Sequence, residues 1–144
     1  MTRYLILAHQ TAASPQLAAT ARELAEGDPD ARFTLLVPAA PPSYWGTWDE
    51  TQAHALAEDQ ASAGRAMLER EGLGEVATVI GNRYPMDALA DELRDGPGYD
   101  ELVICTLPPG ASRWLKLDLP HQAARRFGLP VTHVVAHSRT PAHA

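Results

Sequence analysis

Short runs of apolar residues alternate along this chain with longer stretches in which apolar residues recur every three or four positions. Unbroken apolar runs are typical of strands covered on both faces, as in a parallel sheet, whereas the wider spacing is typical of helices with one buried face. The pattern predicts strands at residues 3–8, 32–37, 75–80, 101–106 and 131–136, and helices at residues 15–27, 49–71, 85–94 and 119–127.

Turn-forming and capping residues mark the ends of these helices. Ser14 precedes Pro15, so the first helix begins with a capping hydroxyl and a proline in its first turn. Pro120 is tolerated only in a first turn, which predicts Asp118 as the N-cap of the last helix and Gly128 as its end.

The alternation of strand and helix indicates the fold class. It predicts an α/β fold, a doubly wound five-stranded parallel sheet with right-handed crossovers and helices on both faces. The chain has 144 residues, 45% of them apolar, which is the size of one domain with a substantial core. We expect a single domain over residues 1–137 and a flexible tail over residues 138–144.

Charge and composition narrow the classes of function. The net charge is −6 and basic residues form no runs, so we expect no binding to nucleic acid or to an anionic membrane. The apolar runs are too short to cross a bilayer, and the first residues lack the features of a secretory signal, so we expect a cytoplasmic protein. Cys105, the single cysteine, lies within an apolar strand, which favours a buried thiol over a reactive nucleophile.

The connection at residues 107–114 follows a predicted strand and precedes a helix and a second strand. In a parallel sheet such a loop lies at the carboxyl ends of the strands, where small ligands usually bind. Its position therefore suits a phosphate site, and its residue types decide whether it can be one.

Short sequence matches at the joints between elements point to a family. Gly81 is followed by Pro85-Met-Asp-Ala-Leu89, Ser14 opens the first helix, and Pro130 precedes the last strand. Together with the order and length of the elements, these matches make the chain resemble the universal stress protein family over almost its whole length. The resemblance implies the strand order 3-2-1-4-5. The turn after Gly81 is two residues longer than the family's Gly-Asp-Pro-x-x-Ala turn.

The residues that bind ATP in members of this family are largely replaced here. Those members carry an aspartate after the first strand and a GxxG stretch followed nine residues later by Gly-Ser or Gly-Thr. The corresponding positions hold His9, Thr106 with Pro109, and Leu117-Asp118. The resemblance therefore implies a diverged member without the usual ATP motif.

The chemistry of the replacements supports this interpretation. Pro108 and Pro109 have no amide hydrogen to donate to a phosphate. Asp118 places a carboxylate near the position of the phosphates, where like charges repel. We expect no cofactor, with ATP or AMP disfavoured.

A different anion site remains open at the same edge of the sheet. Arginine suits bidentate contacts with phosphate or carboxylate groups, and Arg113 and Lys116 lie close to a glycine and a serine hydroxyl. The alternatives are that both cations are solvated loop charges and that Asp118 is an ordinary N-cap. The candidate ligand-binding residues are His9, Gln10, Thr11, Val37, Thr106, Gly110, Ser112, Arg113, Lys116 and Asp118.

Patterns of catalytic and metal-binding residues are absent from the sequence. The 6 histidines form no HxxxH pair on a helix, and there is no nucleophile elbow, Walker loop or dinucleotide-binding glycine motif. Ser112, Asp118 and His121 are near one another in sequence, but proximity along the chain does not establish catalytic geometry. We nominate no catalytic residue and no metal ligand.

The connection at residues 38–48 is rich in proline and aromatic residues and leaves the carboxyl end of the second strand. Tyr44, Trp45 and Trp48 could cover a ligand pocket, pack against a partner, or pack over the sheet edge. The sequence leaves these alternatives open.

The last strand forms a sheet edge if the strand order is that of the family, and an apolar edge needs pairing or cover. The resemblance implies a homodimer through this strand, with Val131, Thr132, His133, Val134 and Val135 at the interface.

These observations lead to a ranked set of functions. The first is a universal stress protein-like, non-enzymatic, dimeric domain with a stress-related or regulatory role and an unknown protein partner or small ligand. The alternative is a nucleotide-binding, anion-binding or slow nucleotide-hydrolysing protein that uses the altered loop at residues 106–118. An enzyme acting on another small substrate is a third possibility, for which we find no catalytic set.

Overall fold

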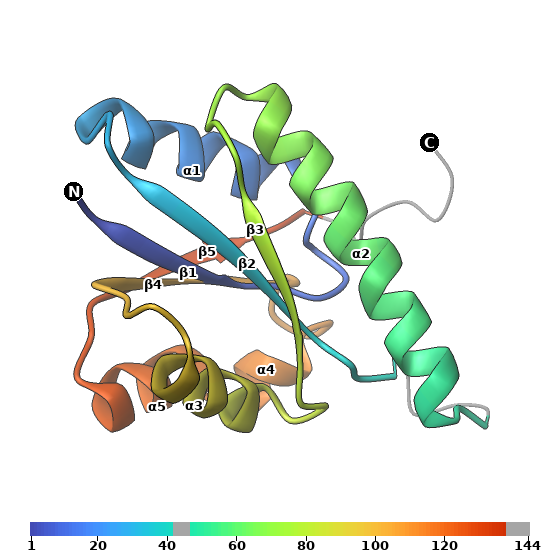
Figure 1. Cartoon of the computed structure of the whole chain (residues 1–144). Helices are drawn as coiled ribbons and strands as arrows, with labels where there is room; N and C mark the ends of the chain where they lie inside the picture. Colours follow the sequence, from blue (N-terminus) through green and yellow to red (C-terminus); the bar gives the residue numbers. More distant parts are fainter. Residues whose placement is uncertain (42–46, 138–144) are drawn as a thin grey trace.

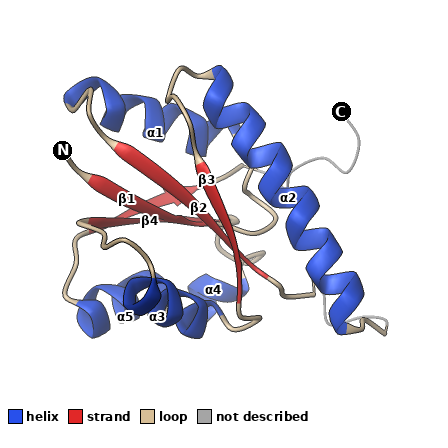
Figure 2. Ribbon diagram, viewed as in Figure 1, coloured by secondary structure: helices blue, strands red, loops and turns tan. Residues whose placement is uncertain are grey.

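The computed structural model describes residues 1–41 and 47–137. Its centre is one parallel sheet with the strand order β3-β2-β1-β4-β5. This confirms the predicted doubly wound α/β fold, with β3 and β5 at the two edges of the sheet. Figure 2 shows the strands between two layers of helices. The strands are β1 (Arg3–Leu7), β2 (Arg32–Pro38), β3 (Ala77–Gly81), β4 (Glu101–Thr106) and β5 (Val131–Val135).

Helices cover both faces of the sheet (Figure 1). The helices α1 (Pro15–Gly27) and α2 (Glu50–Arg70) lie on one face. The opposite face carries α3 (Pro85–Asp95), α4 (Arg113–Lys116) and α5 (Leu119–Phe127). Both faces of each inner strand are therefore covered, which explains why these strands read as unbroken apolar runs.

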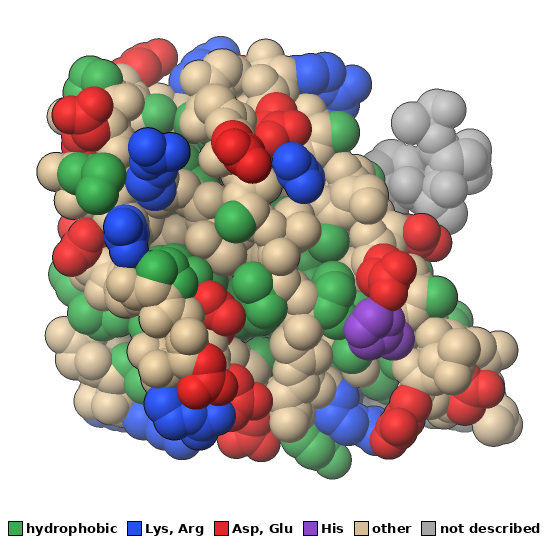
Figure 3. Space-filling model, viewed as in Figure 1, with side chains coloured by type: hydrophobic (Ala, Val, Ile, Leu, Met, Phe, Trp, Pro, Cys, Tyr) green, Lys and Arg blue, Asp and Glu red, His purple; other side chains and the backbone are tan. Residues whose placement is uncertain are grey.

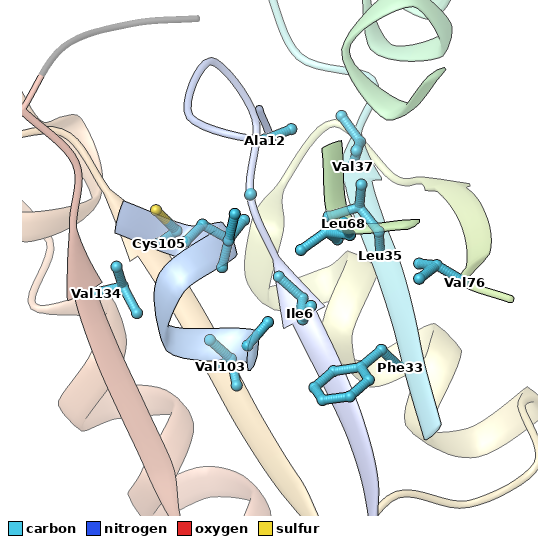
Figure 4. Packing of buried hydrophobic residues seen from close by; sticks show 14 of the residues in the cluster. Ile6, Ala12, Phe33, Leu35, Val37, Leu68, Val76, Val103, Cys105 and Val134 are labelled. Carbon is cyan, nitrogen blue, oxygen red and sulfur yellow. The ribbon is translucent and has the colours of Figure 1, made fainter. Parts of the chain in front are cut away.

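Two apolar cores follow from the alternation of side chains along the strands. Ile6 and Leu35 point toward α1 and α2 and pack with Leu68 (Figure 4). Their neighbours Leu5 and Leu36 point the other way, into the core under α3 and α5. Because every second residue of one strand joins the same core, the register of each inner strand is fixed by burial on both sides.

Most predicted boundaries agree with the structure within one residue, and two differences are larger. The strand β3 begins at Ala77, two residues late, because the amide of Val76 donates to Glu69 Oε2 at 3.1 Å instead of joining the sheet. Residues 113–116, expected within a loop, form the short helix α4, in which the Ser112 hydroxyl accepts a hydrogen bond from the Leu115 amide at 3.1 Å.

Asp118 occupies the N-cap position of α5, as predicted, but it does not act as a capping side chain. Its backbone has a φ of 55°, in the left-handed region, whereas a capping side chain requires an extended backbone. The left-handed turn joins α4 to α5 directly, and the carboxylate lies 2.8 Å from His121 Nδ1. The expectation of an ordinary N-cap is therefore wrong for this side chain.

Other expectations fall partly outside the described residues. Tyr44, Trp45 and the tail at residues 138–144 lie outside them, while the described Trp48 is 41% exposed. Among the residues that the structure describes, no helix is both long enough and apolar enough to cross a bilayer.

Candidate functional site

The segments that follow the strands β1, β2, β3 and β4 enclose a cavity of about 510 Å³ at the carboxyl edge of the sheet. The cavity lies where the connection from β1 turns toward β2 and the connection from β4 turns toward β5, so that neighbouring loops diverge. Small ligands usually bind at such a switch point, in cavities of about 300–1,000 Å³. Position and size both fit a site for a small molecule.

Positive charge distinguishes the wall of this cavity. Arg83, Arg113 and Lys116 line it, and no aspartate or glutamate belongs to the described part of its lining. The net charge of the whole chain is −6, so the charge of the cavity wall is opposite in sign to the net charge of the chain. Such a wall attracts an anionic ligand.

His9 lies at the inner end of the cavity, in the turn that leaves β1. The Ala12 amide closes this turn on the His9 carbonyl at 3.2 Å, which holds the residue beside β1. The side chain lines the cavity although the residue is only 9% exposed. Its Nε2 atom is buried and has no hydrogen-bond partner.

The pKa of His9 is lowered to about 4, mainly by burial. A hydrogen bond with the Ala40 backbone raises this pKa, and the nearby positive charge of Arg113 lowers it. The imidazole is therefore neutral at pH 7. Nε2 has no partner, so the hydrogen bond with the Ala40 backbone involves Nδ1. This hydrogen bond raises the pKa, which means that Nδ1–H donates to the Ala40 carbonyl. Nε2 is left as a hydrogen-bond acceptor.

The hydroxyl groups at the cavity already have partners in the protein. Thr11 Oγ1 donates to the Cys105 carbonyl at 3.2 Å, which ties the loop after β1 to β4. Thr106 Oγ1 lies 2.8 Å from Nε2 of His133 on β5, and the Ser112 hydroxyl caps α4. These groups position the walls of the cavity before any ligand binds.

The loop after β4 does not offer a set of amides to a phosphate. The amides of Ala111 and Ser112 both donate to the Pro108 carbonyl, each at 3.1 Å. Pro108 and Pro109 have no amide hydrogen. Gly110 has a φ of 91°, as the turn requires, and is exposed. Recognition of an anion at this loop therefore depends on side chains.

The structure brings most of the candidate ligand-binding residues together and leaves three aside. Val37 is fully buried in the core beneath α2, and Gly110 and Asp118 are not part of the cavity lining. The residues that share the lining are His9, Gln10, Thr11, Thr106, Ser112, Arg113 and Lys116.

Sequence reasoning missed three larger side chains of the lining. Arg83 and Tyr84 follow β3, and Trp114 lies on α4. The guanidinium of Arg83 lies 5.3 Å from the centre of the Tyr84 ring, and Tyr84 is 58% exposed, so this pair forms part of the rim. The lengthened turn between Gly81 and Pro85 was the available signal for Arg83 and Tyr84.

The remaining polar groups near the cavity do not form a catalytic set. Cys105 is buried, as predicted, and burial raises the pKa of its thiol. His121 pairs with Asp118, while the Ser112 hydroxyl accepts from a backbone amide. Among the described residues, no three histidine, cysteine or acidic side chains are placed to share a metal ion.

Comparison of the chain with models of known protein families finds no match, and comparison with curated proteins also finds none. The cavity and its residues therefore carry the functional argument.

Proposed function

We propose that this protein is a non-enzymatic binding domain for a small anionic ligand, which occupies the cavity at the carboxyl edge of the sheet. The observation that carries the proposal is the cation-rich wall formed by Arg83, Arg113 and Lys116, with no carboxylate in the described lining. Charge-assisted hydrogen bonds from arginine and lysine are stronger than neutral ones and hold carboxylate or phosphate groups well.

The mode of binding differs from that of the universal stress proteins that the chain resembles. In the loop after β4, Pro108 and Pro109 lack an amide hydrogen, and the amides of Ala111 and Ser112 donate to the Pro108 carbonyl, so we expect the anion contacts to come from side chains. ATP and AMP remain disfavoured as ligands, because phosphate chains need several donors in a cradle. Slow nucleotide hydrolysis through residues 106–118 is the alternative function that the same experiment tests.

We also propose a homodimer through β5, as the resemblance implies, with a stress-related or regulatory role. The edge position of β5 supports it, because one side of this strand has no neighbouring strand in the sheet. Val135 is 38% exposed there, which leaves an apolar edge uncovered in the single chain. In the regulatory role, ligand binding would be read by a protein partner.

The proposal is tested by thermal unfolding and calorimetry with phosphate, benzoate, AMP and ATP, each at millimolar concentration with and without magnesium. A ligand present at 100 times its Kd adds about 2.7 kcal/mol to the free energy of unfolding. We expect stabilisation by at least one small anion and a roughly tenfold weaker affinity in Arg113→Gln, since one charge-assisted contact contributes about 1.5–3 kcal/mol.

The matched control is Arg125→Gln, which removes the same charge from an exposed position of α5 outside the cavity lining. Equal weakening by the two variants would indicate an unspecific charge effect and contradict the proposal. No stabilisation by any of the four anions would contradict it as well. Release of phosphate from ATP by the wild type, lost in Arg113→Gln, would favour the alternative function.

A further inference from the structure

The unpartnered Nε2 atom of His9 is the feature of the cavity that anion binding does not explain. Buried polar atoms of folded proteins nearly always have a hydrogen-bond partner, and an exception calls for an explanation. His9 is one of two residues with such an atom in the described part of the chain, and the other, Gln60, does not line the cavity. The unpartnered Nε2 atom therefore belongs to a residue of the cavity wall.

The surroundings of His9 fix it as an acceptor rather than a donor. Its Nδ1 atom is held by the Ala40 backbone, which selects the tautomer with a bare Nε2. The titratable side chains that share the cavity lining are Arg83, Tyr84, Cys105, Arg113 and Lys116. No carboxylate among the described residues of that lining can stabilise a protonated ring, so the acceptor state persists at neutral pH.

Apolar residues share the cavity wall with His9 and the cations. Trp114, Leu107 and Leu117 line the cavity beside Arg113 and Lys116, and Pro85 lines it near Arg83. An apolar body is therefore complementary to most of the wall, while the polar contacts are few and lie at defined places.

We propose that His9 Nε2 accepts a hydrogen bond from the ligand, so that the ligand is an apolar, ring-bearing carboxylate or phosphate ester that also carries a neutral N–H or O–H donor. This inference rests on the proposed anion-binding function and adds the second recognition element. A ligand with an ammonium donor is excluded by the positive charge of Arg113, whose effect already reaches the His9 ring.

A donor requirement gives the site strong selectivity. A site built to hydrogen-bond a ligand rejects an analogue that lacks the donor, because the buried acceptor is then left unpaired. Discrimination between two ligands of equal charge and similar shape is therefore the direct signature of His9 recognition.

The test measures affinities for two matched pairs by calorimetry with the whole chain. The carboxylate pair is indole-3-acetate and 1-methylindole-3-acetate, and the phosphate pair is 4-hydroxyphenyl phosphate and 4-fluorophenyl phosphate. We expect the donor-bearing member of at least one pair to bind tenfold or more tightly than its analogue. The pair that binds decides between carboxylate and phosphate.

Two variants and one spectroscopic measurement complete the test. His9→Phe keeps a ring of similar size without the acceptor and should reduce the preference to less than twofold, while His54→Phe, an exposed change on α2, should preserve it. In the wild type, the 15N resonance of the bare His9 Nε2 should shift with the donor-bearing ligand and not with its analogue, which keeps the test valid if His9→Phe fails to fold.

The outcomes separate this inference from the function on which it rests. Equal affinities within both pairs, together with weaker binding in Arg113→Gln, would overturn the role of His9 and leave the anion site intact. No binding of any of the four compounds at millimolar concentration would overturn this inference. The anion-binding proposal is contradicted separately, if phosphate, benzoate, AMP and ATP also do not stabilise the protein. A preference that survives in His9→Phe would also overturn the role of His9.

Discussion

At the scale of single residues, His9 combines two properties that rarely occur together. It is almost fully buried, and one of its ring nitrogens makes no hydrogen bond within the described protein. Burial of an uncharged imidazole makes the free energy of unfolding depend on pH, because the imidazole binds a proton in the unfolded chain at a pH where it stays neutral in the folded chain.

Stability should fall as the pH is lowered from 7 to 5. The pKa of His9 is about 4 in the folded protein and about 6.5 in the unfolded chain. Between these values only the unfolded state binds the proton, so each pH unit below 6.5 costs about 1.4 kcal/mol. His9 should therefore contribute a loss of about 2 kcal/mol at pH 5, measured as the difference between urea unfolding at pH 7 and pH 5.

His9→Gln should remove most of this pH dependence, because glutamine does not titrate. His133→Gln is the comparison. Partial burial, and then the nearby His121, also lower the pKa of His133, but this residue is much more exposed than His9. It should remove a smaller part. An unchanged pH dependence in His9→Gln would show that the folded imidazole is not held neutral.

At the scale of elements, α2 positions the loop that carries His9. The helix begins with a capping box, in which Asp49 Oδ1 accepts from the Gln52 amide at 2.7 Å and Gln52 Oε1 accepts from the Asp49 amide at 3.1 Å. Near its middle, Gly64 packs directly against the loop after β1. Gly64 thus connects α2 to the loop after β1, which carries His9.

Gly64→Ala should destabilise the fold. A Cβ atom there would lie 2.7 Å from the Ala12 carbonyl oxygen and 2.8 Å from a methyl group of Leu35, and the backbone oxygen cannot easily move. Overpacking of this kind costs about 1–3 kcal/mol, measured by urea unfolding. The control is Gly27→Ala at the end of α1, where a Cβ atom meets nothing within 4 Å. Similar effects of the two substitutions would contradict the close packing of α2.

Asp49→Ala should cost about 1 kcal/mol of unfolding free energy, because it leaves the Gln52 amide without its capping acceptor. Asp49→Asn, which retains an acceptor oxygen, should recover most of this loss. Urea unfolding of the three proteins measures both effects, and a fully stable alanine variant would mean that the capping box contributes nothing.

The elements also explain which parts of the molecule the sequence could predict. The five strands and four longer helices produce apolar patterns long enough to recognise, whereas α4 has 4 residues, little more than one turn. Val37, one of the candidate ligand-binding residues, lies near the end of β2, but its side chain points into the core beneath α2. Arg83 and Trp114 reach the cavity through the path of their connections, which periodicity does not specify.

At the scale of the whole molecule, the distribution of charge and the two sheet edges determine which partners the surface can bind. Acidic and basic side chains are interspersed over the face seen in Figure 3. A surface of this kind gives no long basic stripe on that face for a nucleic-acid backbone. The edge at β5 is the feature that our dimer proposal uses.

Sedimentation velocity should detect a dimer of the wild type at micromolar concentration. Val135→Lys places a charge on the exposed end of β5, and charged side chains on an edge strand oppose pairing with a second chain. The variant should sediment as a monomer. A wild type that remains monomeric over the whole micromolar range would contradict the dimer.

The buried thiol of Cys105 can be used to measure local opening of the structure. Because it is the single cysteine and is 1% exposed, a thiol reagent reacts only after the structure around it opens. When reclosing is faster than the reaction, the labelling rate measures the free energy of that opening. Cys105 also lines the cavity, so a bound ligand should slow the labelling in proportion to its occupancy, without any dye or tag.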